Sequence, residues 1–585
     1  MLNDANIDNI LSCNNVDVAY NYLEEILDGA IKKATSKVKI RRKVNNYWFD
    51  FELQKMRNKK ERLYNKYIGS PTLLNKNKYN ATKNSYEKLI IQKKRSFHQS
   101  LIRKFNGNMK KTWGVINRLL GNFKKKDSSK YIRIKGSSCS DPKIIANEFN
   151  SFFTSLPKKL HNKLPKITDG IRVKRCLNYL NGHEINETIL LRPTSFQEVT
   201  KIIKAFRKKS STGVDNKSPK LLKHFPDKII NCLVHIFNLS LDQGEFISSF
   251  KRAKVVPIHK SDDKQDMKNY RPISLLPVAS KILEKIMYNR VYSFLDRHSF
   301  FYQNQYGFRS SHSTELAGSF LINQICSAID KNMKVMSVFL DMSKAFDCVD
   351  HQILLKKLYR YGIRDKALSW FVSYLSDRTQ RVCFNGTLSE NICSIKSGVP
   401  QGSILGPLLY LIYVNDFHMC LNRSSAILFA DDTTLVVASS DYKELYKMVN
   451  EDLMNLNKWL CLNKLTINLT KTKYMVYSLN NTSPQPPSNL NIRLNGTKVD
   501  RVEVYKFLGV TLDHRLNWKP HMSKLLSKIQ RNLGIVRKIS YFLNRKSLLQ
   551  LFHSMIMSHI RYGITLWHHG QIAVRKKSKH ALINS

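Results

Sequence analysis

The chain contains 585 residues, of which 42% are hydrophobic and 10% aromatic, a composition that can bury large cores and excludes a mainly disordered protein. Lysine and arginine total 97 against 44 acidic residues, giving a formal net charge of +53. Such an excess indicates a large polyanionic partner, most often a nucleic acid.

Cysteine usage and apolar runs indicate the compartment. The ten cysteines are scattered without a CxxC pair, which argues against a disulfide scaffold and against zinc fingers. The polar N-terminus is unlike a secretory signal, and the longest apolar run, residues 404–414, is too short to span a bilayer. We therefore expect an intracellular protein, neither secreted nor bound to a membrane, in the nucleus, the cytoplasm or both.

The N-terminal region is basic and helical in pattern. Apolar residues recur at helical spacing over residues 19–34, and a second amphipathic pattern covers residues 48–64. Residues 31–130 hold 29 Lys/Arg and 5 Asp/Glu, so this segment carries +24 of the net charge. Any single charge run fits a solvated helix face as well as a phosphate-binding one, but the total favours contact with phosphates.

Beyond residue 140 the composition becomes more ordinary. Residues 141–153 and 195–206 are predicted to be helices, and residues 208–219 a loop rich in Ser, Gly and Pro. Short β-rich runs then alternate with helical stretches, which is typical of an α+β fold, with strands predicted at 255–259, 334–341, 426–430 and 433–439. Residues 480–490 read as a loop, and the chain after residue 513 as basic helices.

Two adjacent acids lie between two apolar strands in SAILFADDTTLVVAS. The pattern predicts a tight β-hairpin with Asp431 and Asp432 at its tip. Neighbouring carboxylates flanked by buried strands repel each other and lose hydration, and a divalent cation such as Mg²⁺ is the simplest compensation. A solvated turn is the alternative interpretation, and it is the one that fits Asp262 and Asp263.

A further acid, Asp341, ends the apolar run VMSVFL. Two strands that each end in acidic residues can together hold two metal ions, which activate an attacking 3′-hydroxyl and stabilise a leaving pyrophosphate. One acid after an apolar strand is a weak signal, whereas three in this arrangement are more specific.

Six segments in order carry a family resemblance: NYRPISLLPVASKILEKI, QYGFRSSHST, FLDMSKAFDCVDH, SGVPQGSILGPLLY, FADD and YKFLGVTLD. Together they resemble the successive motifs of reverse transcriptases of non-LTR (LINE-type, jockey-like) retrotransposons. The resemblance implies an α+β right-hand polymerase of fingers, palm and thumb, with an antiparallel palm sheet and a basic helical region before it. It further implies a linker-like region at 1–135, a helical extension at 136–240, fingers and palm at 241–515 and a thumb at 516–585.

Carried onto this sequence, the resemblance implies a two-metal catalytic centre. Asp341, Asp431 and Asp432 would be the catalytic ligands of two Mg²⁺ ions, with Mn²⁺ as an alternative, and Met342 would contribute its backbone carbonyl. Phe346 would lie under the incoming sugar and exclude a 2′-hydroxyl, although the KAFD segment by itself also fits a core phenylalanine.

Other motif residues would bind the nucleotide. Gln401 would hydrogen-bond near the nucleotide 3′-hydroxyl, and Gly402 would let the backbone bend close to it, although Gly and Pro there also fit a simple turn. Positioned cations would hold the triphosphate, although each also fits a surface charge. These cations are Lys254, Lys260 and Arg271. Lys471, also near the nucleotide, would act as the general acid toward pyrophosphate, with a plain surface lysine as the alternative interpretation.

Template and primer contacts follow in the same way. Arg309 would contact the template, whereas Phe507, Leu508 and Gly509 would form a primer grip, with an ordinary buried strand as the alternative interpretation.

The implied function is RNA-directed DNA synthesis from dNTPs, with an RNA template, a DNA primer or target and the element RNA as ribonucleoprotein partner. The alternative is a catalytically silent RNA-binding component of a ribonucleoprotein. Residues 1–240 lack the sequence pattern of the endonuclease domain that precedes such polymerases in complete elements.

Overall fold

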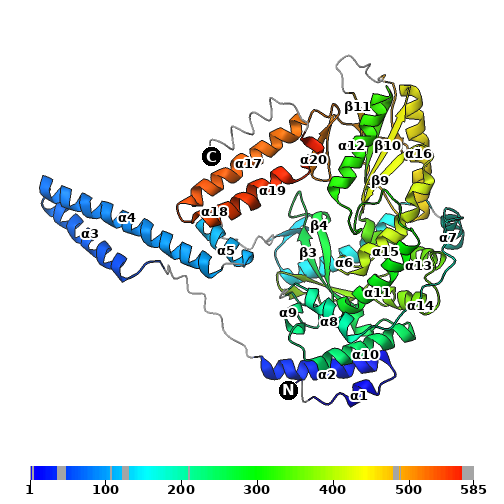
Figure 1. Cartoon of the computed structure of the whole chain (residues 1–585), viewed down its shortest axis with the longest axis horizontal. Helices are drawn as coiled ribbons and strands as arrows, with labels where there is room; N and C mark the ends of the chain where they lie inside the picture. Colours follow the sequence, from blue (N-terminus) through cyan, green and yellow to red (C-terminus); the bar gives the residue numbers. More distant parts are fainter. Residues whose placement is uncertain are drawn as a thin grey trace. The chain divides into compact units, whose positions relative to one another are not determined.

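The computed structural model describes residues 2, 5–35, 48–105, 108–120, 131–165, 167–207, 211–478, 487 and 489–568. It is a mixed α+β structure, as predicted, in which small sheets lie among many helices (Figure 1). Its contacts divide the chain into two compact units. Unit 1 comprises Met1–Thr35 and Ser128–Leu508, and unit 2 comprises Ser36–Asp127 and Gly509–Ser585.

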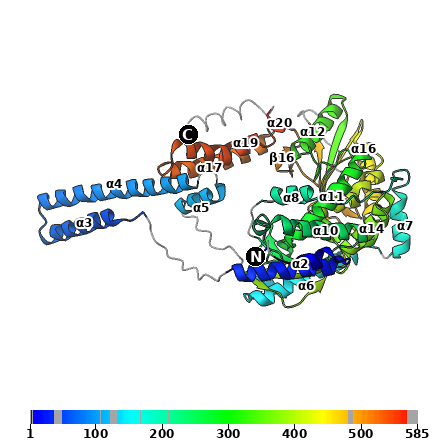
Figure 2. The ribbon, with the colours of Figure 1, turned by 60° about the horizontal axis from the view of Figure 1, so that its bottom comes forward.

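The helices of unit 1 surround its sheets and share one large apolar core. Helix α2 shows how sequence sets their ends: Asn15 caps its first turn by accepting from Asp17 N and Val18 N, and its apolar stripe packs against α10 (Figure 2). The helices are α1 (Asp8–Leu11), α2 (Val16–Ala34), α6 (Pro142–His161), α7 (Asp169–Asn178), α8 (Phe196–Ala205), α9 (Pro219–Leu222), α10 (Asp227–Gln243), α11 (Val278–Arg297), α12 (Thr314–Asp330), α13 (His351–Arg360), α14 (Asp365–Leu375), α15 (Leu405–Val414) and α16 (Tyr442–Leu462). Short 3₁₀ turns are η1 (Ser248–Lys251), η2 (Met267–Asn269), η3 (Ala345–Cys348) and η4 (Asn415–Cys420).

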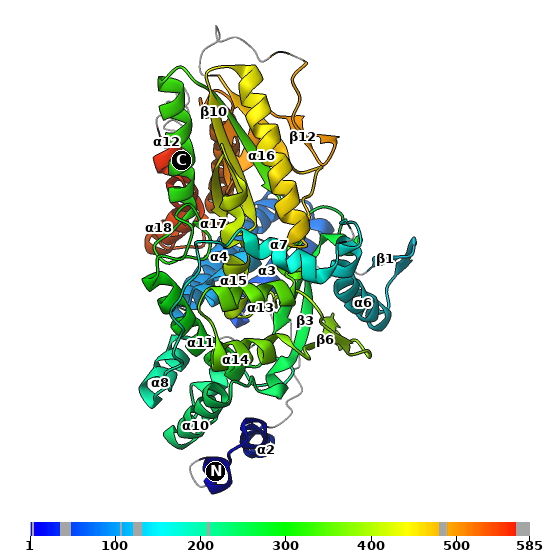
Figure 3. The same cartoon turned by 90° about the vertical axis from the view of Figure 1, so that its right-hand side faces the viewer.

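The main sheet of unit 1 has the strand order β14–β11–β5–β10–β9. Its pairs are antiparallel except for β14, which runs parallel to β11. Residues 335–340 of β5 are all buried because α12 and α16 pack against this sheet (Figure 3). The strands are β5 (Lys334–Asp341), β9 (Ser425–Phe429), β10 (Asp432–Ser439), β11 (Lys473–Tyr477) and β14 (Asp500–Arg501).

A second sheet has the order β4–β3–β6–β7, with β8 also paired to β6. Strand β3 is antiparallel to β4 and parallel to β6, and α6 packs on this sheet through a cluster that includes Phe149 and Phe153. The strands are β3 (Arg252–His259), β4 (Tyr270–Leu275), β6 (Thr379–Phe384), β7 (Thr387–Leu388) and β8 (Cys393–Ser394). The remaining strands of unit 1 are β1 (Ile132–Ile134), β2 (Ser137–Cys139), β12 (Arg493–Leu494), β13 (Thr497–Lys498) and β15 (Val504–Phe507).

Unit 2 joins two parts of the chain that are more than 380 residues apart in the numbering. Ile102, Val115 and Ile116 share a small core with Ile539, Leu543 and Leu551. Beyond this core, α3 and α4 form a long antiparallel hairpin (Figure 2). The elements are α3 (Phe51–Gly69), α4 (Leu73–Lys104), α5 (Met109–Leu119), β16 (Val510–Asp513), α17 (Lys519–Ser540), α18 (Arg545–Phe552), the π turn η5 (His553–Met557), α19 (Ser558–Arg561) and α20 (Ile564–Trp567).

The predicted helices and strands named above are confirmed where the structure describes them. Most of the predicted loop at 480–490 and the basic C-terminal residues 569–585 lie outside the described residues. Among the described helices, none combines the length and the apolar character needed to cross a bilayer. The boundaries at 135, 240 and 515 rest on composition and resemblance, and they stay predictions.

Candidate active site

The three acids of the sequence prediction lie at one end of the main sheet. Asp341 is the last residue of β5, and Asp432, the first of β10, is its direct antiparallel partner. Side chains so paired have Cβ atoms about 5 Å apart. Phe429 pairs with Asp432, so Ala430 and Asp431 form a two-residue turn in which Ala430 takes a left-handed φ of 59°. The predicted hairpin with acids at its tip is confirmed.

The charges of these acids act on one another. Burial, and then the negative charges of Asp431 and Asp341, raise the pKa of Asp432 to about 6. Burial also raises the pKa of Asp431, and Lys260 and Arg271 partly oppose this rise. The cluster is therefore electrostatically unfavourable as it stands, which is the condition that a bound cation relieves.

The donor set fits a hard divalent cation. Aspartate oxygens from two adjacent strands are the ligands that Mg²⁺ prefers, and no soft sulfur or imidazole donor is among the predicted ligands. Within the described residues, no three His, Cys, Asp or Glu side chains already form a metal-binding group. The fit thus rests on the chemistry and the pairing of the carboxylates.

The segment 466–472 holds the C-terminal end of β5. Ser343 N donates to Thr466 O (2.8 Å), and Asn468 N donates to Asp341 O (2.8 Å). Met342 forms an isolated bridge with Ile467, and its side chain is buried, so only its backbone is available to the site. These bonds fix the backbone that carries Asp341.

The turn at Ala430 is held by a residue that the sequence reasoning missed. Gln305 is 3% exposed, and its Oε1 accepts from Gly307 N (2.9 Å) and from Ala430 N (3.2 Å). A Cβ on Gly307 would lie 2.3 Å from Ala430 N, so the two backbones are in close contact. Gln305 therefore positions the turn that carries Asp431.

Replacing Gln305 by alanine is expected to lower the free energy of unfolding by about 1–2 kcal/mol, because two buried N–H groups lose their acceptor. Gln305→Glu keeps an acceptor oxygen and is the matched control. Thermal unfolding of both variants measures the effect. Equal loss of stability in the two variants would contradict the assigned hydrogen bonds.

The predicted triphosphate-binding cations fall into two places. Lys260 and Arg271 lie near the acids, since both affect the pKa of Asp431 and Asp432. Lys254 lies six residues before Lys260 along β3 and its extension, about 20 Å away. The structure therefore does not bring Lys254 together with the other cations.

Lys344 belongs to the same basic cluster and was also missed. Burial lowers its pKa, and Lys260, Arg271 and Lys471 act in the same direction. Its Nζ donates to Tyr270 O (3.1 Å), and its backbone is left-handed with φ 50°. A basic cluster therefore lies near the three acids at this end of the main sheet. It consists of Lys260, Arg271, Lys344 and Lys471.

Phe346 lies on η3 just after Asp341. Its ring stacks on Tyr410 with centroids 4.4 Å apart, and Phe308 meets it edge-on at 6.0 Å. Tyr410 is buried and donates to Met342 Sδ (3.5 Å), and its pKa is raised by burial and by Asp431 and Asp432. Phe346 thus rests on a rigid aromatic support beside the acids.

The SGVPQG segment runs along η3. Gly398 N donates to Val349 O (2.7 Å), and Val399 N donates to Phe346 O (2.9 Å). Gly398 has φ 85° and a Cβ there would lie 2.6 Å from Asp347 O, so only glycine fits. These contacts fix the segment against the residues that follow Asp341.

The end of this segment faces the second sheet. Gln401 Nε2 donates to Asp347 Oδ1 (2.8 Å), and Gln401 O accepts from Ser274 N (2.7 Å). Gly402 has φ 124°, and a Cβ there would lie 2.5 Å from Ser274 O. Gln401 therefore lies between η3 and β4, and Gly402 lies against β4.

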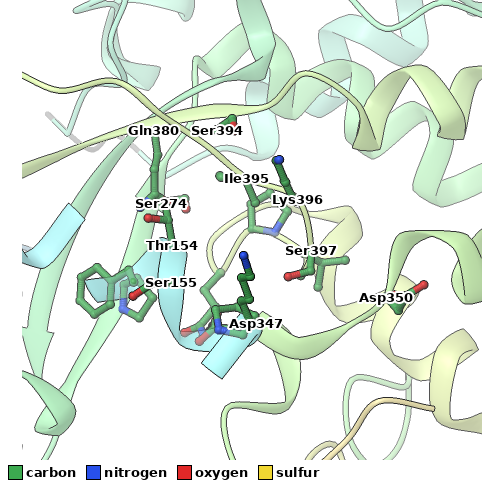
Figure 4. A pocket seen from close by; sticks show the side chains of 18 of the residues that line it. Thr154, Ser155, Ser274, Asp347, Asp350, Gln380, Ser394, Ile395, Lys396 and Ser397 are labelled. Atoms are coloured by element: carbon green, nitrogen blue, oxygen red, sulfur yellow. Dashed lines mark hydrogen bonds between the residues drawn. The ribbon is translucent and has the colours of Figure 1, made fainter. Parts of the chain in front are cut away.

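A cavity of about 530 Å³ opens beside Gln401 (Figure 4). It lies between α6, β4 and the SGVPQG segment, and polar side chains such as Asp347, Lys396 and Ser397 line it. Its size and lining suit a polar ligand.

The predicted template and primer residues lie as follows. Arg309 Nη1 donates to Tyr302 O (3.1 Å) and Gln305 O (3.4 Å), so this side chain braces its own loop. Phe507 ends β15 within 6.4 Å of Phe339, counted between ring centroids. Leu508 is the last residue of unit 1 and Gly509 the first of unit 2. Their contacts with nucleic acid stay predictions.

Tyr505 on β15 is another residue that the sequence reasoning missed. It stacks on Phe339 with centroids 3.9 Å apart, and its pKa is raised to about 12 by burial and by the charges of Asp432 and Asp341. Gln305, Lys344, Asp347 and Tyr505 all lie inside the quoted motif segments, so their place in those segments is the signal that could have found them.

Acids at the ends of paired strands, with cations and a phenylalanine beside them, are the residue types that the sequence predicts for a two-metal site. Residues 258–512 match the family described as "Reverse transcriptase (RNA-dependent DNA polymerase)". This part of the chain is a reverse transcriptase domain, as the motifs predicted, and it is similar to polymerases of mobile elements.

Several curated relatives are insect mobile-element proteins. The probable RNA-directed DNA polymerase from transposon BS of Drosophila melanogaster is 31% identical over 397 residues, which cover 64% of this chain and 42% of that protein. The RNA-directed DNA polymerase from mobile element jockey of the same species is 28% identical over 388 residues, covering 64% and 42%. The probable RNA-directed DNA polymerase from its transposon X-element is 27% identical over 381 residues, covering 63% and 41%. The matched region thus spans about two fifths of the length of these relatives.

Proposed function

We propose that this chain is an RNA-directed DNA polymerase that adds dNTPs to a primer 3′-hydroxyl on an RNA template. In this proposal residues 241–515 form the fingers and palm of a right-hand polymerase, and residues 516–585 belong to its thumb. The observation that carries the proposal is the direct pairing of Asp432 with Asp341, with Asp431 in the adjoining turn. A protein that only bound RNA would gain nothing from clustered carboxylates, which repel a polyanion.

Asp341, Asp431 and Asp432 would hold the magnesium ions, together with the backbone carbonyl of Met342. Bound magnesium would activate the primer hydroxyl and stabilise the leaving pyrophosphate. Lys260 and Arg271 would hold the phosphates of the incoming nucleotide, because both are close enough to the acids to lower the pKa of Asp431.

Lys471 is proposed as the acid that protonates the pyrophosphate. It is exposed on the segment that holds Asp341, and its charge acts on Lys344. Phe346 would pack under the sugar, and Gln401 would bond near its 3′-hydroxyl.

Incorporation of labelled dTTP on a poly(rA)/oligo(dT) substrate with Mg²⁺ tests this function. The expected result is template-dependent extension by the purified chain. Binding of the same substrate without extension would favour the alternative, a catalytically silent RNA-binding component.

We also propose that the α3–α4 hairpin contacts nucleic-acid phosphates. Its two helices carry 15 Lys/Arg against 3 acids. Many of these lysines are exposed along both helices, including Lys55, Lys59, Lys76 and Lys83. Each phosphate contact releases counterions, so RNA affinity should fall steeply with added salt.

Changing those four lysines to glutamine is expected to reduce the slope of log affinity against log salt by about 3 for single-stranded RNA, if each contacts one phosphate. Filter binding across a salt series measures the slope. The matched control removes the same charge from unit 1, at the exposed residues Lys174, Lys331, Lys443 and Lys498. An equal change of slope in both variants would indicate a general charge effect and contradict a hairpin contact.

A further inference from the structure

Asp347 is a partly buried acid that directly follows Phe346 in η3. The proposed reaction gives it no role. Its Oδ1 accepts a hydrogen bond of 2.8 Å from Gln401 Nε2. A carboxylate can only accept hydrogen bonds, whereas the amide of a glutamine has a donor end and an acceptor end. The bond therefore decides which end of the Gln401 amide points away from Asp347, and that end is Oε1.

The two residues are held in register by their backbones. Gly398 N and Val399 N donate to Val349 O and Phe346 O, and Gly398 packs directly on the Asp347 backbone. Ser274 N fixes the carbonyl of Gln401 from the opposite side. With the main chain fixed at both residues, the side-chain bond has little freedom to rearrange.

The carboxylate is in the accepting form under assay conditions. Burial raises the pKa of Asp347 to about 6, and the bond from Gln401 and the charge of Lys344 oppose that rise. At about pH 8 the group is therefore ionised. Lys344 directly precedes η3, and its positive charge favours the ionised form of Asp347.

We propose that Asp347 is a positioning residue that orients Gln401 so that an acceptor oxygen faces the 3′ position of the incoming nucleotide. This inference rests on the proposed function and deepens it. Phe346 and Asp347 are neighbours on one turn, so this turn would set selectivity at both the 2′ and the 3′ position of the sugar. A 3′-hydroxyl donates to Gln401 Oε1, whereas a 3′-fluorine, which cannot donate, meets it unfavourably.

The test compares two chain-terminating substrates, dideoxythymidine triphosphate and 3′-fluoro-3′-deoxythymidine triphosphate, on poly(rA)/oligo(dT). The wild-type chain is expected to prefer the dideoxy substrate about fivefold, because it avoids an oxygen–fluorine contact. Asp347→Asn lets the amide turn over and present its NH₂ group to the fluorine. The preference should then fall to about twofold or less.

A double variant tests whether the direction of the hydrogen bond between residues 347 and 401 determines the preference. In Asp347→Asn with Gln401→Glu, the new amide donates to a carboxylate that can only accept, so the preference for the dideoxy substrate should return. Asp347→Ala is the second single variant, and it should also lose the preference. Asp350→Asn is the matched control, since Asp350 lines the same cavity but pairs with Lys464 (2.7 Å).

The outcomes separate the two proposals. A wild-type chain that incorporates neither dTTP nor the terminators fails the proposed function, and the inference fails with it. A wild-type chain that polymerises, with an unchanged preference in Asp347→Asn and Asp347→Ala, overturns the role of Asp347 alone. Loss of the preference in Asp350→Asn to the same degree would also overturn it, because the effect would then be general to the cavity.

Discussion

Asp431→Asn is expected to reduce primer extension on the order of a thousandfold, equivalent to about 4 kcal/mol of barrier. The substitution keeps the size of the side chain and the two-residue turn but removes one negative charge from the cluster with Asp341 and Asp432. The remaining carboxylates then hold cations less well, while the surrounding backbone bonds stay in place. Steady-state incorporation of labelled dTTP measures the loss.

RNA affinity of the same variant should be unchanged or slightly higher, since a negative charge near a polyanion has been removed. Asp262→Asn is the matched control, because it changes an Asp–Asp pair in an exposed loop. That control should extend primers at the wild-type rate. Extension by Asp431→Asn at more than a tenth of the wild-type rate would contradict the assignment of Asp431 as a metal ligand.

The position of each acid at the end of a strand could be predicted from sequence, because each acid directly follows or precedes an apolar run. Asp341 follows six apolar-rich residues, and Asp431 and Asp432 interrupt two such runs at the spacing of a hairpin. Strand periodicity places a terminal residue at the sheet end without any knowledge of distant contacts. The order of the strands, with β5 between β11 and β10, depends on non-local pairing and was not predicted.

Other features depend on contacts between distant segments. The role of Gln305 becomes visible only when residues 304–307 lie against residues 428–430. The core of unit 2 likewise combines Ile116 with Ile539, two residues in regions that composition alone describes only as basic helix. Apart from the place of Gln305 in a motif, such contacts leave no local pattern in the sequence, because glutamine and isoleucine occur in many environments.

The cations show an intermediate case. Lys254 and Lys260 lie in KRAKVVPIHK and Arg271 in the NYRPIS segment that follows it, and composition cannot separate their roles. The β3–β4 register does so by pairing Ile258 with Arg271 at one end of the sheet and Lys254 with Leu275 at the other. Only the first end lies near the acids, as the effects on the pKa of Asp431 indicate.

Phe346→Val is expected to lower the discrimination against ribonucleotides on the order of 100-fold. In the proposed function, a 2′-hydroxyl has to fit against a ring that Tyr410 supports from below at 4.4 Å, so the ring cannot retreat. Forcing an extra atom into a packed site costs about 1–3 kcal/mol, which corresponds to roughly 5-fold to 150-fold in rate. Valine removes the ring face but keeps an apolar side chain at that position.

The measurement is the ratio of kcat/KM for dTTP to that for UTP on the same poly(rA)/oligo(dT) substrate. Phe51→Val is the matched control, since Phe51 is 84% exposed and lies in unit 2. The control ratio should equal that of the wild type, and the Phe346→Val ratio should fall mainly through faster use of UTP. If the ratio stays constant while both rates fall together, Phe346 supports the core and does not select the sugar.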